Sequence, residues 1–342
     1  MRDCFLAMRE NDTILHLGNA HFQTYALFAA HQLGIFEHIA KKTSISLTEL
    51  GQASNLSERP LQALLAVCAA IGLLTVDDNC NYAVSDVTRM CLLKSSVFPW
   101  GRMLDMHLIN PDSISYQSLI NALSKNSAQI YDDADLFEAN ESSKERAVAF
   151  TRAMHGKSMA SSLHWPAIAN LTDHACLLDV AGGSGAHAIS AVKAYAHLRG
   201  LVLDRPEVCN VAREYIAEAG LEDRIDAAAF NIWQDAFPKA DVHFYSDVFH
   251  DWSHEDCRTL AKKSFTSLPK GGKILLHELL FNDNKTGPLS AALYNMVMLM
   301  WTKGQQFSAS ELTQLLEDVG FVGIEIARTG YGDWSLVTGR KP

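Results

Sequence analysis

An apolar segment that runs into an acidic residue and then into closely spaced glycines constrains this chain more than any other feature. Residues 177–188 read LLDVAGGSGAHA, in which Asp179 precedes Gly182, Gly183 and Gly185. Such a sequence predicts a strand, a tight glycine turn and a helix whose first N–H groups are unpaired. We therefore expect a doubly wound α/β domain that binds a nucleotide-like cofactor at this turn.

Two cofactors compete for the turn. Residues 183–188 satisfy the dinucleotide pattern G-x-G-x-x-G/A, and Asp204 lies close to where that pattern places an acid for the ribose. However, Asp179 lies at the entry to the loop and no basic residue follows until Lys193, so a pyrophosphate would meet negative charge. S-adenosylmethionine carries a sulfonium and an ammonium group, and its ribose could also bind Asp204. We favour S-adenosylmethionine, with NAD as the alternative.

Composition bounds the class of protein. The chain has 342 residues, 48% of them hydrophobic, which is enough for a large core and suggests two domains. Its net charge of −10 disfavours nonspecific attraction to nucleic acid or to an anionic membrane. We see no long apolar span and no leader, and the seven cysteines are scattered without a C-x-x-C pair. These features predict a cytoplasmic protein with reduced thiols.

The first part of the chain predicts a helical domain with a small winged element. Ser46 and Glu49 form a possible capping box, and leucines at helical spacing follow as far as Gly72. Residues 73–76 and 82–84 flank a turn and predict a hairpin. A helix-turn-helix with a wing raises DNA binding as an alternative function. The acidic balance of this part argues against a phosphate-binding face, so dimerisation is the favoured role.

From about residue 166 onwards, strands and helices alternate, which predicts a mainly parallel sheet covered on both faces. The expected strands are residues 176–180, 200–203, 226–230, 242–248, 273–280, 323–327 and 334–338. We therefore place a helical, winged-helix-like domain at residues 1–165 and the cofactor-binding domain at residues 166–342.

The best candidate for a catalytic base follows the fourth predicted strand. Ser253 and Asp256 resemble a capping box that begins a helix, so His250 and Asp251 fall at the carboxyl end of a central strand. A neutral imidazole is a suitable acceptor for the proton of a hydroxyl group. Glu278, near the end of the next predicted strand, could orient that imidazole.

Together these motifs resemble the small-molecule O-methyltransferases that use S-adenosylmethionine, a family that includes plant caffeate-type and bacterial hydroxyindole-type enzymes. The likeness rests on residues 179–185 (DVAGGSG), 204–208 (DRPEV), 250–252 (HDW), 269–272 (PKGG) and Glu278. Upstream, residues 29–36 (AAHQLGIF) resemble the dimerisation segment of that family, and residues 150–154 (FTRAM) resemble its acceptor-pocket helix.

The resemblance implies a Rossmann-like class I methyltransferase domain, a homodimer formed through the N-terminal domain, and a set of site residues. The catalytic residues would be His250 as the base, Glu278 and Asp251. The donor would bind Asp179, Gly182, Gly183, Gly185, Asp204, Arg205, Asn231, Ile232, Ser246 and Trp252. The acceptor would contact Phe150, Met154, His155, Asn295, Met298 and Trp301. No metal, nucleic-acid or membrane partner is expected.

Three positions depart from the pattern of the family. Asn231 stands where an aspartate is common, Ser246 where plant members have a basic residue, and Gln306 roughly where they have a second glutamate. The methionine carboxylate of the donor therefore needs another partner, and Glu278 would be the only carboxylate that supports His250. We expect O-methylation of a small, aromatic acceptor of secondary metabolism. C- or N-methylation on the same scaffold is the alternative.

Overall fold

The computed structural model describes residues 13–130, 136 and 143–342. The chain divides into two compact units, one that extends to Leu108 and one from Ile109 to Pro342. This division falls well before the boundary expected at residue 165.

The reason for the earlier division is the long helix α10 (Lys144–Ser162). It packs against α12 (Ala186–Ala194) and α13 (Pro206–Glu218), two helices that cover the large sheet. The acceptor-pocket helix expected from the sequence therefore belongs to the catalytic unit.

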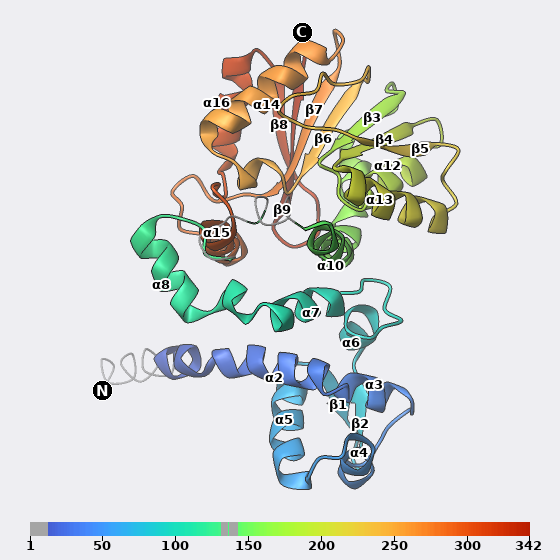
Figure 1. Ribbon diagram of the computed structural model, residues 1–342, viewed down its shortest axis with the longest axis vertical. Coiled ribbons are helices and arrows are strands. Elements are labelled where there is room, and N and C mark those ends of the chain that lie inside the picture. Colours follow the sequence, from blue (N-terminus) through green and yellow to red (C-terminus); the bar gives the residue numbers. More distant parts are fainter. Residues whose placement is uncertain (1–12, 131–135, 137–142) are drawn as a thin grey trace. The chain divides into compact units, whose positions relative to one another are not determined.

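The first unit is helical with one small hairpin (Figure 1). Its helices are α2 (His21–Gln32), α3 (Ile35–Ala40), α4 (Leu47–Ser54), α5 (Glu58–Ala70), α6 (Asp86–Cys91) and α7 (Gly101–Ile109). Strands β1 (Leu74–Val76) and β2 (Tyr82–Val84) pair antiparallel after α5, so helix, helix and wing follow one another as the sequence predicted. Ser46 and Glu49 form the expected capping box at the start of α4.

The second unit is built on a seven-stranded sheet with the order β5-β4-β3-β6-β7-β9-β8. The strands are β3 (Cys176–Val180), β4 (Arg199–Asp204), β5 (Ile225–Ala229), β6 (Val242–Ser246), β7 (Lys273–Leu279), β8 (Val322–Arg328) and β9 (Trp334–Arg340). The first five are parallel, and β9 joins β7 and β8 antiparallel. Each observed strand agrees with its predicted range to within two residues at either end, because the central strands are apolar runs bounded by turn residues, while the exposed edge strand β8 still carries isoleucines and a valine.

Helices cover both faces of the sheet (Figure 1). Apolar residues of α12 and α13 form one core layer with the sheet, and those of α14 (His254–Ser267) and α16 (Ala309–Val319) form the other. The remaining elements are η1 (Pro111–Ile114), α8 (Tyr116–Lys125), α11 (Pro166–Ala169), η2 (Phe249–Asp251) and α15 (Leu289–Trp301). Strand order reverses between β3 and β6, and ligands bind at the carboxyl ends of strands at such a switch point.

Candidate active site

A cavity of about 510 Å³ lies where the parallel strands end, in the size range of small-molecule sites. Most of the site residues expected from the sequence line it. These are Phe150, Met154, Asp179, Gly182, Gly183, Asp204, Arg205, Asn231, Ile232, Ser246, His250, Asp251, Trp252, Met298 and Trp301.

Four expected residues lie outside this lining. Gly185 begins α12 with φ of 76°, and a Cβ atom there would lie 3.1 Å from Cγ2 of Val202, so this glycine permits close packing of helix on sheet. Glu278 lies behind His250, as described below. His155 and Asn295 make the contacts described next.

His155 and Asn295 support other parts of the site. His155 places Nδ1 2.8 Å from the hydroxyl of Ser184, and its ring stacks on Tyr215 with 3.5 Å between centroids. It therefore supports the glycine turn and lies outside the acceptor part of the cavity. Asn295 accepts the backbone N–H of Gln306 through Oδ1 at 2.8 Å, which fixes the segment that carries Gln306.

The glycine turn is shaped around Asp179. A Cβ atom at Gly182 would lie 2.6 Å from Cγ of Asp179, so only glycine fits at this position. Oδ2 of Asp179 accepts the backbone N–H of Ala188 at 3.1 Å, and Oδ1 is buried with no hydrogen-bond partner among the described residues. Burial, together with the nearby charge of Asp204, raises the pKa of Asp179 to about 8, although the hydrogen bond from the N–H of Ala188 opposes this.

Asp204 forms a second carboxylate at the turn. Its Oδ2 accepts the N–H of Gly183 at 2.9 Å and its Oδ1 accepts the N–H of Arg205 at 2.8 Å. Burial raises the pKa of Asp204 despite these hydrogen bonds. The buried carboxyl group of Asp179 and the partly buried one of Asp204 therefore face this end of the cavity, and one oxygen of Asp179 has no partner among the described residues. A cation such as a sulfonium or ammonium would stabilise the ionised forms of these groups, whereas a pyrophosphate would oppose their ionisation, so the residues fit S-adenosylmethionine better than NAD.

Two tryptophans, Trp233 and Trp252, line the cavity near Asn231. Trp233 and Trp252 meet edge to face with 4.8 Å between ring centroids. Asn231 uses Oδ1 to accept the N–H of Trp233 at 2.9 Å, so the amide replaces the aspartate of related sequences as the acceptor that shapes this loop. The arrangement offers flat apolar surfaces for a base next to the carboxylate of Asp204.

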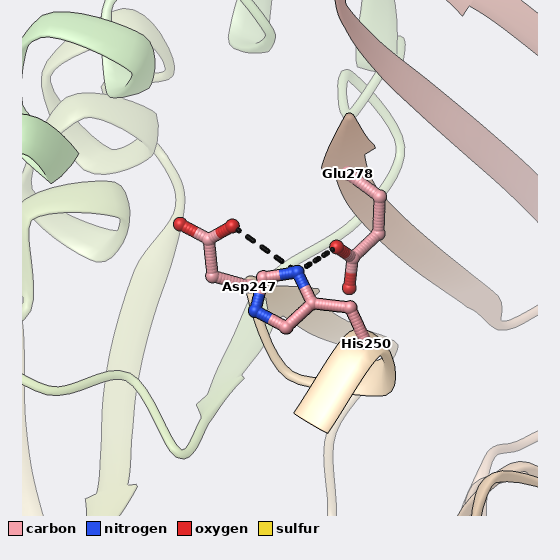
Figure 2. A group of neighbouring side chains, drawn as sticks. All are labelled: Asp247, His250 and Glu278. Carbon is pink, nitrogen blue, oxygen red and sulfur yellow. Dashed lines mark ion pairs between the residues drawn. The ribbon is translucent and has the colours of Figure 1, made fainter. Parts of the chain in front are cut away.

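His250 lies in η2 directly after β6, and two carboxylates meet one of its ring nitrogens (Figure 2). Oε2 of Glu278 lies 2.9 Å from Nδ1, and Oδ1 of Asp247 lies 3.5 Å from the same atom. The other ring nitrogen, Nε2, is 3.5 Å from Oδ1 of Asp251, a cavity-lining residue. Glu278 is held in turn because its Oε1 accepts the N–H groups of Val248 and Phe249.

The contact between Nδ1 and Glu278 fixes the tautomer of His250. A carboxylate oxygen 2.9 Å away requires the proton on Nδ1, which leaves Nε2 as the atom available to accept a proton. The side-chain amide of Gln306 lies 3.1 Å from Nδ1, and its other polar atom is buried without a partner among the described residues. Nε2 of Gln306 is the atom placed nearest the ring; with the proton on Nδ1, the amide would have to be turned so that its oxygen accepts that N–H, since amide O and N are assigned from their hydrogen bonds.

Opposing effects act on the protonation of this group. Burial alone would lower the pKa of His250, but the charges of Glu278, Asp251 and Asp247 outweigh it and raise the pKa to about 9. Burial raises the pKa of Asp251 to about 7, although the imidazolium opposes this. His250 is therefore protonated at neutral pH unless another positive charge approaches it.

Two further histidines, His187 and His277, lie near the same strand ends as His250 but have aromatic neighbours instead of carboxylates. His187 accepts a hydrogen bond from Nε1 of Trp165 at 3.1 Å, and His277 stacks on Trp334 with 4.5 Å between ring centroids. We call His187 and His277 the aromatic histidine pair. Burial lowers the pKa of His187 to about 4, and burial together with the charges of His187 and Lys157 lowers that of His277 well below its usual value.

Ser246 hydrogen-bonds to this pair and provides no positive charge. Its Oγ lies 2.8 Å from Nδ1 of His277. The position that is basic in plant relatives is therefore neutral here. Nη1 of Arg205 is buried without a partner among the described residues and lies at the cavity, so it is a candidate for the missing cation.

The structure adds functional residues that the sequence analysis missed. Asp247 is a second carboxylate at Nδ1, which corrects the expectation that Glu278 alone supports His250. Lys157 pairs with Asp247, and Tyr294 lies between that pair and His250. An acidic residue at the carboxyl end of a strand was the available signal for Asp247, which follows β6, as it was for Asp179 in β3 and Asp204 in β4.

The acceptor side of the cavity is apolar and aromatic. Phe150 and Met154 come from α10, and Met298 and Trp301 come from α15. Nε1 of Trp301 donates to the carbonyl oxygen of Ser113 at 2.8 Å, which fixes the ring. This part of the lining thus offers sulfur-containing and aromatic side chains, which suit apolar contacts.

Comparison with known proteins identifies the family. Residues 116–322 match the O-methyltransferase domain, and residues 15–94 match the O-methyltransferase dimerisation domain. The chain belongs to the O-methyltransferase family. It is 30% identical over 91% of its length, and 90% of the relative, to a 3-hydroxy-5-methyl-1-naphthoate 3-O-methyltransferase of Streptomyces sahachiroi.

Two further relatives of this methyltransferase bear on fold and chemistry. An L-tyrosine C(3)-methyltransferase of Streptomyces lavendulae is 26% identical over 90% of the chain and 86% of the relative. The crystal structure of human N-acetylserotonin methyltransferase in complex with S-adenosylmethionine matches 97% of both chains with a TM-score of 0.86 and 24% identity. The expected Rossmann-like class I methyltransferase fold is thus confirmed.

The family assignment decides the role of the N-terminal unit. Its match to the dimerisation domain confirms the expected homodimer-forming role and leaves the DNA-binding alternative without support. S-adenosylmethionine is the methyl donor of the family, which agrees with the two carboxylates at the glycine turn. Among the described residues, no helix combines the length and the apolar character needed to cross a membrane.

Proposed function

We propose that this methyltransferase transfers a methyl group from S-adenosylmethionine to a hydroxyl group of a small aromatic acceptor, with His250 as the general base. The observation that carries the proposal is the 2.9 Å contact between Nδ1 of His250 and Glu278. It keeps the proton on Nδ1 and leaves Nε2 to accept one. General-base help of this kind contributes typically about 10²–10⁴ in rate.

The chain's own residues divide the work of binding. Asp204 would bind the ribose hydroxyls, Asp179 and the N–H groups of the glycine turn would face the methionine part, and Asn231 with Ile232 would flank adenine. When bound, S-adenosylmethionine supplies an electrophilic methyl group on a positively charged sulfur. That positive charge, placed in the cavity that His250 lines, opposes imidazolium formation and lowers the pKa of His250 from about 9.

The acceptor then meets a base in its neutral form. Phe150, Met154, Met298 and Trp301 would hold an aromatic ring by apolar contact. Nε2 of His250 removes the hydroxyl proton as the oxygen attacks the methyl group, and Glu278 stabilises the imidazolium that results. A bound aromatic acceptor would itself displace water from this apolar lining, which includes the buried Trp301, and water would otherwise compete as an acceptor.

C-methylation is a second candidate, because one relative is an L-tyrosine C(3)-methyltransferase. A base beside an aromatic hydroxyl can also increase the electron density of the ring carbon next to it. Both reactions can be tested in one experiment, in which the enzyme and donor are incubated with hydroxynaphthoates, hydroxyindoles and tyrosine, and the product is identified by mass spectrometry and NMR. A methyl ether supports the proposal, and methylation of a ring carbon or nitrogen contradicts it.

We further propose that the protein acts in the cytoplasm. The six described cysteines Cys68, Cys80, Cys91, Cys176, Cys209 and Cys257 are all free thiols, as expected for a reducing compartment. Fractionation of source cells with antibody detection tests this location. Recovery of the protein in an extracellular or periplasmic fraction would contradict it.

A further inference from the structure

A largely but not fully buried ion pair lies next to His250. Nζ of Lys157, on α10, is 2.9 Å from Oδ2 of Asp247, and the side chains of both residues are only 12% exposed. Lys157 also donates to the hydroxyl of Tyr294 and lies over the rings of Tyr294 and Trp334. The lysine is therefore confined to one position by a carboxylate on one side and aromatic rings on the others.

Asp247 connects this lysine to His250. One carboxylate oxygen faces Lys157 and the other lies 3.5 Å from Nδ1 of His250. The Asp247 backbone has φ of 54°, in the left-handed region that side chains other than glycine rarely adopt. Its N–H donates to the carbonyl oxygen of His277 on β7 at 3.2 Å, which holds the residue in this conformation. Such strain persists only where the surroundings enforce it, and it is common at functional sites.

The charges that face His250 from each element can be counted. Asp247 and Asp251 come from its own segment and Glu278 from β7, while α15 supplies the hydroxyl of Tyr294 and the following loop the amide of Gln306. Helix α10 supplies Lys157 as the partner of Asp247. With His250 as the imidazolium and Asp251 in its ionised form, these groups amount to three negative and two positive charges. Without Lys157, the excess of negative charge would double from one to two.

We propose that Lys157 and Asp247 act as a positioning pair that sets the proton affinity of His250, with Asp247 increasing it and Lys157 limiting the increase. Too little proton affinity makes a weak base, and too much keeps the base protonated at working pH. A neutral residue at either position would therefore move His250 away from the value that suits its role. The effect on rate rests on the proposed function of His250, whereas the effect on protonation does not.

A purely structural ion pair would behave differently. Removing either partner of an ion pair that is shielded from water leaves an uncompensated charge. Both single variants would then have a lower free energy of unfolding than the wild type. An electrostatic role predicts opposite changes, because Asp247→Asn removes a negative charge near His250 and Lys157→Met removes a positive one. The direction of the change thus separates the two explanations.

The experiment is an NMR titration of the full-length dimer labelled with ¹³C in its histidine rings, with the His250 signal assigned by its loss in His250→Gln. We expect Asp247→Asn to lower the pKa of His250 by at least about 0.5 unit and Lys157→Met to raise it by a similar amount. The double variant should return close to the wild-type value. Lys157→Arg, which keeps the charge, should leave the value unchanged, and Lys157→Gln takes the place of the methionine variant if that variant does not fold.

A matched control is Lys273→Met, because Lys273 bonds to the carbonyl oxygens of Ala169 and Asn170 and makes no contact with Asp247. Its removal should leave His250 unaffected. The inference is overturned if both single variants move the pKa of His250 in the same direction, or if neither moves it by more than about 0.3 unit.

Kinetics separates this inference from the proposed function. If His250 is the base, the acidic limb of the pH–rate profile should move in the same direction as the NMR values, to lower pH in Asp247→Asn and to higher pH in Lys157→Met. If the NMR values move as expected and the limb does not, the pair is confirmed and the assignment of His250 as the base fails. If the NMR values do not move, the pair is rejected even where an acidic limb is observed.

Discussion

His250 and the aromatic histidine pair are equally buried, yet they hold opposite charge states. His250 faces Glu278, Asp251 and Asp247, and its pKa is raised to about 9. His187 lies beside Trp165 and Phe244 in the same unit, and its pKa is lowered to about 4. Burial disfavours the charged imidazole at both places, so the neighbouring groups decide the protonation state. Carboxylates favour the protonated imidazole of His250, and aromatic rings leave the imidazole of His187 neutral.

The largest test of this contrast is the removal of the His250 imidazole. His250→Ala should lower kcat on an aromatic hydroxyl acceptor by at least about 10²-fold, because the general base is lost. Donor binding should persist, since the donor carboxylates are separate residues, and equilibrium dialysis with S-adenosylhomocysteine measures this. Unchanged turnover would remove His250 from the mechanism.

The next largest effect is expected where the charge of one carboxylate is removed. Glu278→Gln keeps an oxygen for the N–H groups of Val248 and Phe249 but removes the charge beside Nδ1. We expect kcat to fall by about 10–10²-fold and the pKa of His250 to fall, because the imidazolium loses its closest partner. Gln314→Asn, on the exposed side of α16, is a control of similar size. Equal losses in both variants would show that the decrease is not specific to the base.

The aromatic histidine pair should respond through stability. Its folded pKa values lie below the usual value of 6.5, so below pH 6.5 the unfolded chain binds protons that the folded chain excludes, and stability falls as the pH falls. His187→Gln retains an acceptor for the N–H of Trp165. The free energy of unfolding of this variant should decrease by about 1–2 kcal/mol less than that of the wild type between pH 6.5 and pH 5. Urea unfolding at both pH values measures it, and an identical slope in the variant would contradict the assignment.

His250 should make stability depend on pH in the opposite direction. Its folded pKa is raised, so its contribution to stability is fully present below pH 6.5 and is lost as the pH rises through about 9. The same urea series, extended to pH 9.5, should therefore show alkaline destabilisation that His250→Ala lacks. The two substitutions together test whether neighbours rather than depth of burial set these charge states.

The smallest expected effect is that of metal removal. Proton transfer by His250 to and from a hydroxyl group requires no metal ion, so EDTA should leave turnover unchanged. The metal content of the treated enzyme should be measured by mass spectrometry alongside the rate. Loss of activity that a divalent cation restores would point to a different mechanism at the same histidine.

The sequence was a good guide wherever local pattern determines structure. Strand β3 begins and ends at the predicted residues because a short apolar run between turn signals has few alternatives. His250 and Glu278 were predicted together because the carboxyl ends of neighbouring parallel strands meet at one edge of the sheet. The positions of both residues follow from strand order, which the family pattern supplies.

Contacts between distant segments could not be predicted in this way. Lys157 and Asp247 are 90 positions apart, and their pairing depends on how α10 packs on the sheet unit. The same packing explains why the boundary between the two units falls at Leu108 rather than at residue 165. His155 shows the converse, because its neighbour Met154 lines the cavity while His155 turns towards Ser184.

The buried Asp179 should release a proton when the methyl donor binds. With a pKa of about 8, this carboxyl group holds its proton at neutral pH, and a cation entering the glycine turn favours the ionised form. The proton must then pass to the surrounding buffer. Calorimetric heats of association should accordingly differ between phosphate and Tris by the ionisation enthalpies of those buffers, and apparent affinity should increase with alkalinity up to about pH 8.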